Sequence, residues 1–268
     1  MNLYIAIEII SFLGLILFSL LCFLRVQIST DINRLVYLFN LFFLTVIAFF
    51  HYLFVLNYIS NTLTLVTSLL LLMTFLVFFL LSIVSYQFTR LRIIFIPFFF
   101  FLAFFRFFIG MSSINDNDSL RLFENSFLIL HIITSLLAYS LITISLATSF
   151  CSFIQDSHIR KMKYNKIIDD SLPSIYESEL LAIRFLYLTI IFLIVSLISG
   201  LYYFIETGEE LIYFFNEKAI LSLTTLIITI LIILIRGIRG LSGQMVFKMI
   251  FLSYIFISFS YFGIKLLG

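Results

Sequence analysis

Long apolar stretches alternate with short polar segments along the whole chain. A helix needs about 20 mostly apolar residues to cross the hydrocarbon core of a bilayer. Eight stretches come close to that length, and we expect each to form a transmembrane helix. The pattern therefore predicts an all-α, polytopic membrane helix bundle with residues 1–268 in a single membrane domain. The predicted spans are residues 3–24, 35–56, 63–85, 93–111, 126–154, 185–205, 219–235 and 245–267.

The composition supports this fold class and excludes several others. About 63% of the 268 residues are hydrophobic, 11% are charged, and the mean hydropathy is +1.20. No soluble fold of this size has enough interior to bury so much apolar surface. Soluble enzymes, disordered chains and disulfide scaffolds are excluded, and little polar surface remains for a nucleic acid. The sequence also has no nucleotide-binding, zinc-protease or serine-hydrolase motif, so we expect no enzymatic activity.

Basic residues predict the orientation, because cytoplasmic loops carry an excess of Lys and Arg. Three basic residues fall on one side of the predicted bundle: Arg121, Lys218 and Lys265. The opposite side holds twelve, and its longest loop covers about residues 155–184. We therefore expect both termini on the outer (periplasmic) side of the membrane.

Ionisable residues within the spans lie at one predicted depth. Such residues are costly in a bilayer, so each is a candidate for function. Four of them lie about five residues from the outer end of a span, roughly 7–8 Å below the boundary at 1.5 Å per residue. These four are Glu8, His51, Arg106 and His131. Glu217 and Lys218 open the seventh span, and Lys265 lies near the outer end of the eighth. The inner half has almost no ionisable groups, which argues against a continuous ion path.

The two embedded histidines suggest a cofactor. Two neutral imidazoles on antiparallel helices at matched depth can hold one iron between them, so His51 and His131 are predicted axial ligands of a b-type haem. Arg106, Lys218 and Lys265 are the predicted contacts for its propionates. Two alternatives stay open. In one, the histidines bond to each other or to a hydroxyl. In the other, Glu8 and Arg106 neutralise each other as a buried pair.

Short segments in the C-terminal half carry a family resemblance. They are LHIITSLLAY (130–139), LPSIYESE (172–179), ISGLY (198–202), EKAILSL (217–223), RGIRGLSG (236–243) and YFGIK (261–265). In this order they resemble the cytochrome c assembly membrane proteins, and most closely their eight-span, CcsA-related, YpjD/HemX-like branch. The N-terminal half resembles the family in its span pattern and in His51.

The resemblance implies a protein that handles haem near the outer face of the membrane, with His131 as an outer-face ligand and His51 as its partner. A second outer-face histidine of many relatives falls at Glu217, which is a carboxylate here. The Trp-rich WWD segment of the haem-attaching members is absent, because the chain has no Trp. We therefore expect an accessory role in cytochrome c biogenesis, with haem, the lipid bilayer and other membrane proteins of cytochrome maturation as partners.

Two other functions stay open. A cofactor-free membrane scaffold, or a regulatory partner of a transporter or enzyme complex, would use the polar residues as a structural hydrogen-bonded network. A small-solute transporter is disfavoured, because polar residues through the inner half of the bundle and broken helices are not evident in the sequence.

Overall fold

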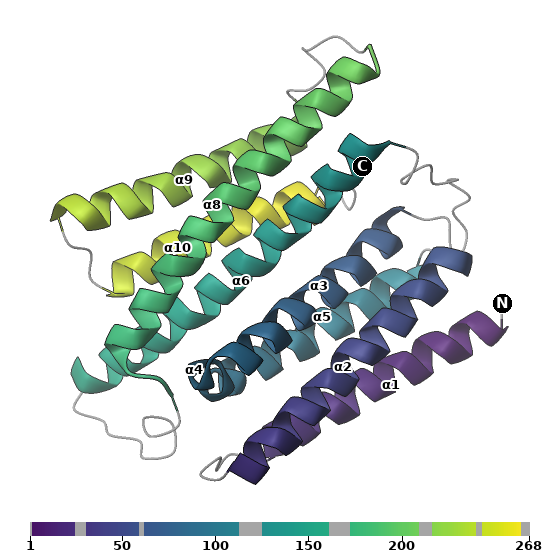
Figure 1. Cartoon of the computed structure of the whole chain (residues 1–268), viewed down its shortest axis with the longest axis horizontal. Coiled ribbons are helices and arrows are strands. Elements are labelled where there is room, and N and C mark those ends of the chain that lie inside the picture. The colour runs from purple at the N-terminus through teal and green to yellow at the C-terminus, as the bar shows by residue number, and fades with distance from the viewer. Residues whose placement is uncertain are drawn as a thin grey trace. The chain divides into compact units, whose positions relative to one another are not determined.

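The computed structural model describes residues 2–24, 31–58, 62–112, 125–160, 172–208, 216–239 and 243–263. Within these ranges every regular element is helical, which confirms the all-α prediction (Figure 1). The elements are α1 (Asn2–Leu24), α2 (Asp31–Tyr58), α3 (Thr62–Val84), α4 (Tyr86–Arg90), α5 (Arg92–Ser112), α6 (Ser126–Arg160), α8 (Ile175–Glu206), α9 (Glu217–Arg239), α10 (Gly243–Ser258) and the π-helical turn η2 (Phe259–Gly263).

Six of the described helices are long and apolar enough to cross a membrane, namely α2, α3, α6, α8, α9 and α10. Two further predicted spans correspond to α1 and α5, whose apolar parts are the shorter Ile5–Leu21 and Ile94–Phe108. The chain therefore has the helices of a multi-pass membrane protein. The number of eight spans and the outer position of both termini stay predictions.

Part of the predicted loop at 155–184 is helical, because α6 continues to Arg160 and α8 begins at Ile175. Its place as the longest cytoplasmic loop stays a prediction. The start of α8 is fixed by a capping box. Ser174 Oγ accepts a hydrogen bond from the Glu177 backbone nitrogen (3.3 Å), and Glu177 Oε2 accepts one from the Ser174 nitrogen (3.2 Å). Both bonds satisfy donors that a helix start leaves free. Hydropathy marks the apolar part of a helix, whereas these polar residues mark its end.

The described helices belong to two compact units. The N-terminal unit comprises Met1–Leu120 with Lys166–Pro173, and the C-terminal unit comprises Arg121–Asn165 with Ser174–Gly268. Each unit has its own packing. The single membrane domain stays a prediction.

In the N-terminal unit, α1 and α3 each pack against both α2 and α5. Between α3 and α5 the core is aromatic: the ring centroids of Phe78 and Phe95 are 4.2 Å apart, and those of Phe75 and Phe99 are 4.5 Å apart. All four rings are almost fully buried. Tilted and edge-on aromatic pairs of this kind add to the free energy gained from burial.

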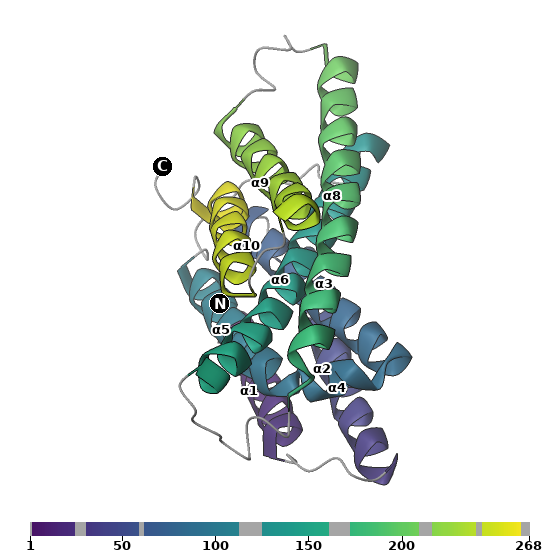
Figure 2. The same ribbon diagram turned by 90° about the vertical axis from the view of Figure 1, so that its left-hand side faces the viewer.

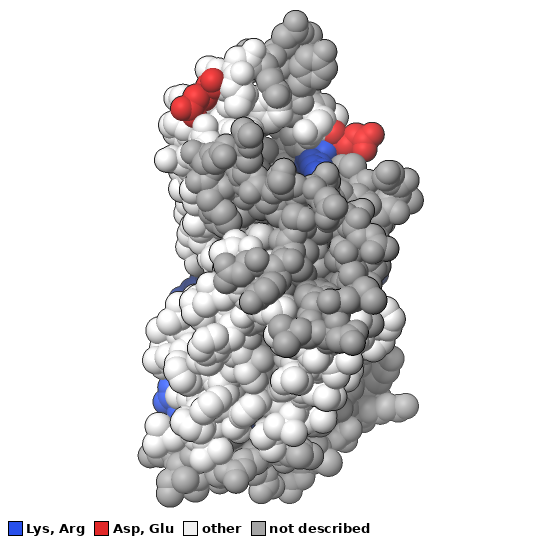
Figure 3. All heavy atoms as spheres, turned by 90° about the vertical axis from the view of Figure 1, so that its right-hand side faces the viewer, with Lys and Arg blue, Asp and Glu red and all other residues white. Residues whose placement is uncertain are grey.

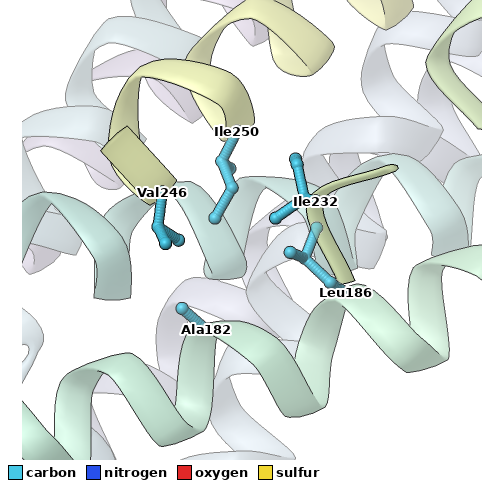
Figure 4. Packing of buried hydrophobic residues seen from close by; sticks show 5 residues of the cluster. All are labelled: Ala182, Leu186, Ile232, Val246 and Ile250. Carbon is cyan, nitrogen blue, oxygen red and sulfur yellow. The ribbon is translucent and has the colours of Figure 1, made fainter. Parts of the chain in front are cut away.

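In the C-terminal unit, α6 and α8 form the most extensive helix pairing and run side by side (Figures 1 and 2). Small side chains allow the two backbones to approach closely, and Ser145 Oγ donates a hydrogen bond to the Ala182 carbonyl oxygen (2.8 Å). A cluster of buried hydrophobic residues joins α8, α9 and α10 (Figure 4). Its buried members are Ala182, Leu186, Ile232, Val246 and Ile250.

Beside this cluster, an ion pair and a close packing contact join the same helices. Arg236 Nη2 on α9 lies 3.6 Å from Glu179 Oε2 on α8. A side chain at Gly243, the first residue of α10, would collide with the Glu179 carboxylate, because a Cβ there would lie 2.5 Å from Oε1. A side chain at position 243 therefore requires the Glu179 carboxylate to shift.

The outer surface of the described helices is largely apolar. On the face drawn in Figure 3, charged side chains are sparse among the described residues. Large apolar side chains such as Ile191, Ile198 and Tyr202 on α8 are about half exposed. Hydrocarbon chains are a suitable solvent for such a surface, and water is not.

The aromatic core yields a stability prediction. We expect Phe78→Ala to lower the free energy of unfolding by about 3–5 kcal/mol, because the side chain is fully buried and leaves a cavity. Phe39→Ala is the matched control, since Phe39 lies in the same unit and is 61% exposed. Denaturation of both purified variants in detergent measures the difference. Equal stability of the two variants contradicts the described core.

Candidate functional site

Three predicted site residues meet in the N-terminal unit. Glu8 lies on α1, His51 on α2 and Arg106 on α5, and all three are at most 5% exposed. Arg106 Nη2 donates a hydrogen bond to Glu8 Oε1 (2.9 Å), and His51 Nε2 lies 3.1 Å from Glu8 Oε2. We refer to these residues as the Glu–His–Arg triad. The carboxylate and the guanidinium form the buried pair that the sequence left open as an alternative.

Nε2 of His51 lies within hydrogen-bonding distance of both partners, 3.1 Å from Glu8 Oε2 and 3.5 Å from Arg106 Nη2. A carboxylate accepts and a guanidinium donates, so the shorter contact with Glu8 favours the tautomer that carries a hydrogen on Nε2. In that tautomer Nε2 has no lone pair for an iron. Ligation of iron by that atom requires the bond to Glu8 to break, so the role of His51 as an axial ligand stays a prediction.

Arg106 is not fully satisfied by the triad. Its Nε and Nη1 atoms are shielded from solvent and have no hydrogen-bond partner among the described residues. Buried donors without an acceptor are unfavourable, so Arg106 retains capacity for a further oxygen ligand. Its predicted propionate contact is compatible with this geometry and stays a prediction.

His131 lies in the C-terminal unit, on α6. Its Nδ1 is 2.7 Å from the backbone carbonyl oxygen of Ser196 on α8 and 3.2 Å from Ser196 Oγ. A carbonyl oxygen only accepts, so Nδ1 carries the hydrogen and Nε2 carries the lone pair. Nε2 has no hydrogen-bond partner among the described residues. The imidazole is thus held in the tautomer that binds a metal through Nε2.

The ends of α6 and α8 near His131 are tied together. Asn125 Nδ2 donates a hydrogen bond to Glu206 Oε2 (2.8 Å), and the rings of Phe127 and Tyr202 are stacked with centroids 5.7 Å apart. These contacts join the first turn of α6 to the last turns of α8. They hold together the ends of the two helices that carry His131 and its acceptor.

The remaining predicted site residues do not join these groups. Glu217 and Lys218 open α9 and are exposed, and neither forms a hydrogen bond or ion pair with His131 in the described ranges. Ser260 Oγ on η2 donates to the Lys218 carbonyl oxygen (3.0 Å), so Lys218 contributes its backbone to packing. Lys265 lies outside the described residues. No group of three or more metal-binding side chains occurs within the described part of the chain.

The sequence did not single out a group of hydroxyls on α6 and α10. Tyr139 OH donates to Tyr254 OH (3.0 Å) and lies 3.2 Å from Ser258 Oγ. The ring of Tyr261 on η2 meets Tyr139 edge-on, with centroids 5.3 Å apart. Tyr139 ends the segment LHIITSLLAY and Tyr261 begins YFGIK. Both rings of this contact therefore lie in segments that carry the family resemblance, which is the feature of the sequence that pointed to them.

Comparison with known proteins decides the family. The family model described as "Cytochrome C assembly protein" matches residues 38–268 of the 268-residue chain. The chain belongs to the cytochrome c assembly protein family. His51, Arg106 and His131 lie within the matched residues, and Glu8 precedes them. The predicted resemblance is confirmed, and membership indicates a role in cytochrome c biogenesis in a family associated with haem handling.

One curated relative is itself uncharacterised. The "Uncharacterized 28.8 kDa protein in nifR3-like 5'region" of Azospirillum brasilense is 28% identical over 139 residues, which are 51% of this chain and 49% of the relative. The match thus spans about half the length of that relative. No solved structure matches the chain.

The triad yields a prediction about charge. Glu8→Gln leaves the buried Arg106 guanidinium uncompensated, so we expect a loss of about 3–5 kcal/mol in the free energy of unfolding. The double variant Glu8→Gln/Arg106→Gln removes both charges and should recover part of that loss. Denaturation of the single and double variants in detergent tests the coupling, and additive losses would contradict the described pair.

Proposed function

We propose that this member of the cytochrome c assembly family binds a b-type haem through Nε2 of His131, near the outer face of a bacterial inner membrane. The observation that carries the proposal is the hydrogen bond from His131 Nδ1 to the Ser196 carbonyl. It leaves Nε2 unprotonated, and histidine ligands to metals almost always donate their other nitrogen in this way. A neutral imidazole is also a common axial ligand of haem iron, so the donor chemistry fits.

The proposed role is accessory to cytochrome c biogenesis and does not include catalysis. A bound haem supplies a redox-active iron, and the chain supplies a ligand nitrogen on a rigid helix pair. The missing WWD segment supports a role in holding or passing haem, within the YpjD/HemX-like branch, alongside other membrane proteins of cytochrome maturation. Lys218 and Lys265 stay predicted propionate contacts.

A second candidate function is a cofactor-free membrane scaffold or regulatory partner. The Glu–His–Arg triad favours it, because Glu8 bonds to both His51 and Arg106 as a member of a structural network would. This function requires that the purified protein contains no haem, including after expression with added haem precursor.

The proposal predicts the effect of replacing the ligand. The detergent-purified protein should give a b-type reduced-minus-oxidised absorption spectrum with stoichiometric haem, and His131→Ala should lose most of that haem. His158→Ala is the matched control, since His158 lies on the same helix near its other end. Unchanged haem content in His131→Ala would contradict the site.

The predicted role of His51 has its own test. If His51 is the second axial ligand, His51→Ala should convert low-spin ferric haem to high-spin haem, because one strong-field ligand is lost. Electron paramagnetic resonance of the ferric protein measures the spin state. An unchanged low-spin signal would show that His51 serves the triad and does not bind the iron.

A further inference from the structure

The ring of His131 lies against a place on α8 that has no side chain. Gly200 is one helical turn beyond Ser196, and both residues are buried. A Cβ added at Gly200 would lie 3.0 Å from His131 Nδ1 and 3.1 Å from Cε1, which is tighter than nine in ten real Cβ contacts. Any side chain at position 200 therefore requires the imidazole to move.

The backbone of α8 gives no reason for a glycine at this position. Gly200 lies inside a regular helix, and the described glycine with a positive φ is Gly208, two residues after α8 ends (φ 71°). Alanine stabilises a helix interior better than glycine does. The reason for the glycine is therefore the space that it leaves beside the imidazole.

The acceptor on α8 is a backbone group. His131 Nδ1 and Ser199 Oγ both donate to the Ser196 carbonyl oxygen, at 2.7 Å and 2.9 Å. No side-chain substitution removes that oxygen. The distance from ring to carbonyl depends instead on how closely the ring approaches α8, and Gly200 controls that approach.

We propose that Gly200 is a positioning residue for His131. Its missing side chain lets the imidazole lie close to α8, where the Ser196 carbonyl fixes the hydrogen on Nδ1 and leaves the Nε2 lone pair for a ligand. The functional part of this inference rests on the proposed haem site, whereas the positioning itself is a property of the protein without haem. It also gives a physical reason for the glycine within the segment ISGLY.

The first test needs no haem. Nitrogen-15 NMR of the imidazoles in haem-free, histidine-labelled protein reports which ring nitrogen of His131 carries the hydrogen, with His131→Gln used to assign its signals. The wild type should show the Nδ1–H form. Gly200→Ala should shift His131 toward a mixture of both forms, because the ring moves away from the carbonyl. An unchanged Nδ1–H form in Gly200→Ala overturns the proposal.

Two control variants separate positioning from general damage. Gly237→Ala on α9 places its Cβ in open space, so it should leave the His131 signals unchanged. Ser196→Ala retains the carbonyl acceptor and should keep the Nδ1–H form. If Ser196→Ala alters the tautomer as much as Gly200→Ala does, the side chain of Ser196 is the determinant and the proposal fails.

A haem titration adds the functional readout. Gly200→Ala should weaken haem binding by about 10–100-fold, the usual cost of disturbing a group that orients a metal ligand. If Gly200→Ala does not fold, the test uses a His131→Gly background, in which no histidine ring meets the added Cβ. Added imidazole should restore haem binding to the His131→Gly variant, and should restore it less in the His131→Gly/Gly200→Ala double variant. Equal restoration in both backgrounds overturns the proposal.

The two proposals fail in different ways. If the wild type binds no haem but the His131 tautomer shifts in Gly200→Ala, the haem function is wrong and the positioning role stands. If the wild type binds haem, and Gly200→Ala changes neither the haem affinity nor the His131 tautomer, the haem function stands and the positioning role is wrong.

Discussion

One hydrogen bond determines the chemistry available in the C-terminal unit: the bond from His131 Nδ1 to the Ser196 carbonyl oxygen. It selects the tautomer of the imidazole, orients the ring and leaves Nε2 with a lone pair. The bond exists because α6 and α8 pack closely along their length through small side chains. The helix pairing thus comes first, and the properties of the histidine follow from it.

The segments that carry the family resemblance contact one another in this unit. Tyr139 and Tyr261 bring LHIITSLLAY and YFGIK together, and Glu179 and Arg236 join LPSIYESE to RGIRGLSG. Gly200 of ISGLY lies against the ring of His131. These segments therefore supply contacts that join the helices of the C-terminal unit.

Hydropathy predicted the cores of the helices, since each predicted span falls mainly on a helix, but it did not predict their ends. The start of α8 depends on the polar pair Ser174 and Glu177, outside the apolar stretch. Depth along the helices predicted that Glu8, His51 and Arg106 share one level, and the structure brings them into contact.

Depth does not specify which way a side chain points around its helix. A hydrogen-bonded network of these residues was therefore only one alternative, and the specific contact between Glu8 and Nε2 of His51 was not predicted. For the same reason, the contact of His131 with Ser196 could not be predicted. These residues are 65 positions apart in the chain and meet only through helix packing.

The central claim is that Nε2 of His131 binds haem iron. Pulsed electron paramagnetic resonance of the ferric protein, with nitrogen-15 histidine in a His51→Ala background, tests it most directly. The account predicts a strong nitrogen-15 coupling from one axial imidazole, lost when His131 is also replaced. A haem-loaded protein without such a coupling, or one that keeps it after loss of His131, would contradict the account.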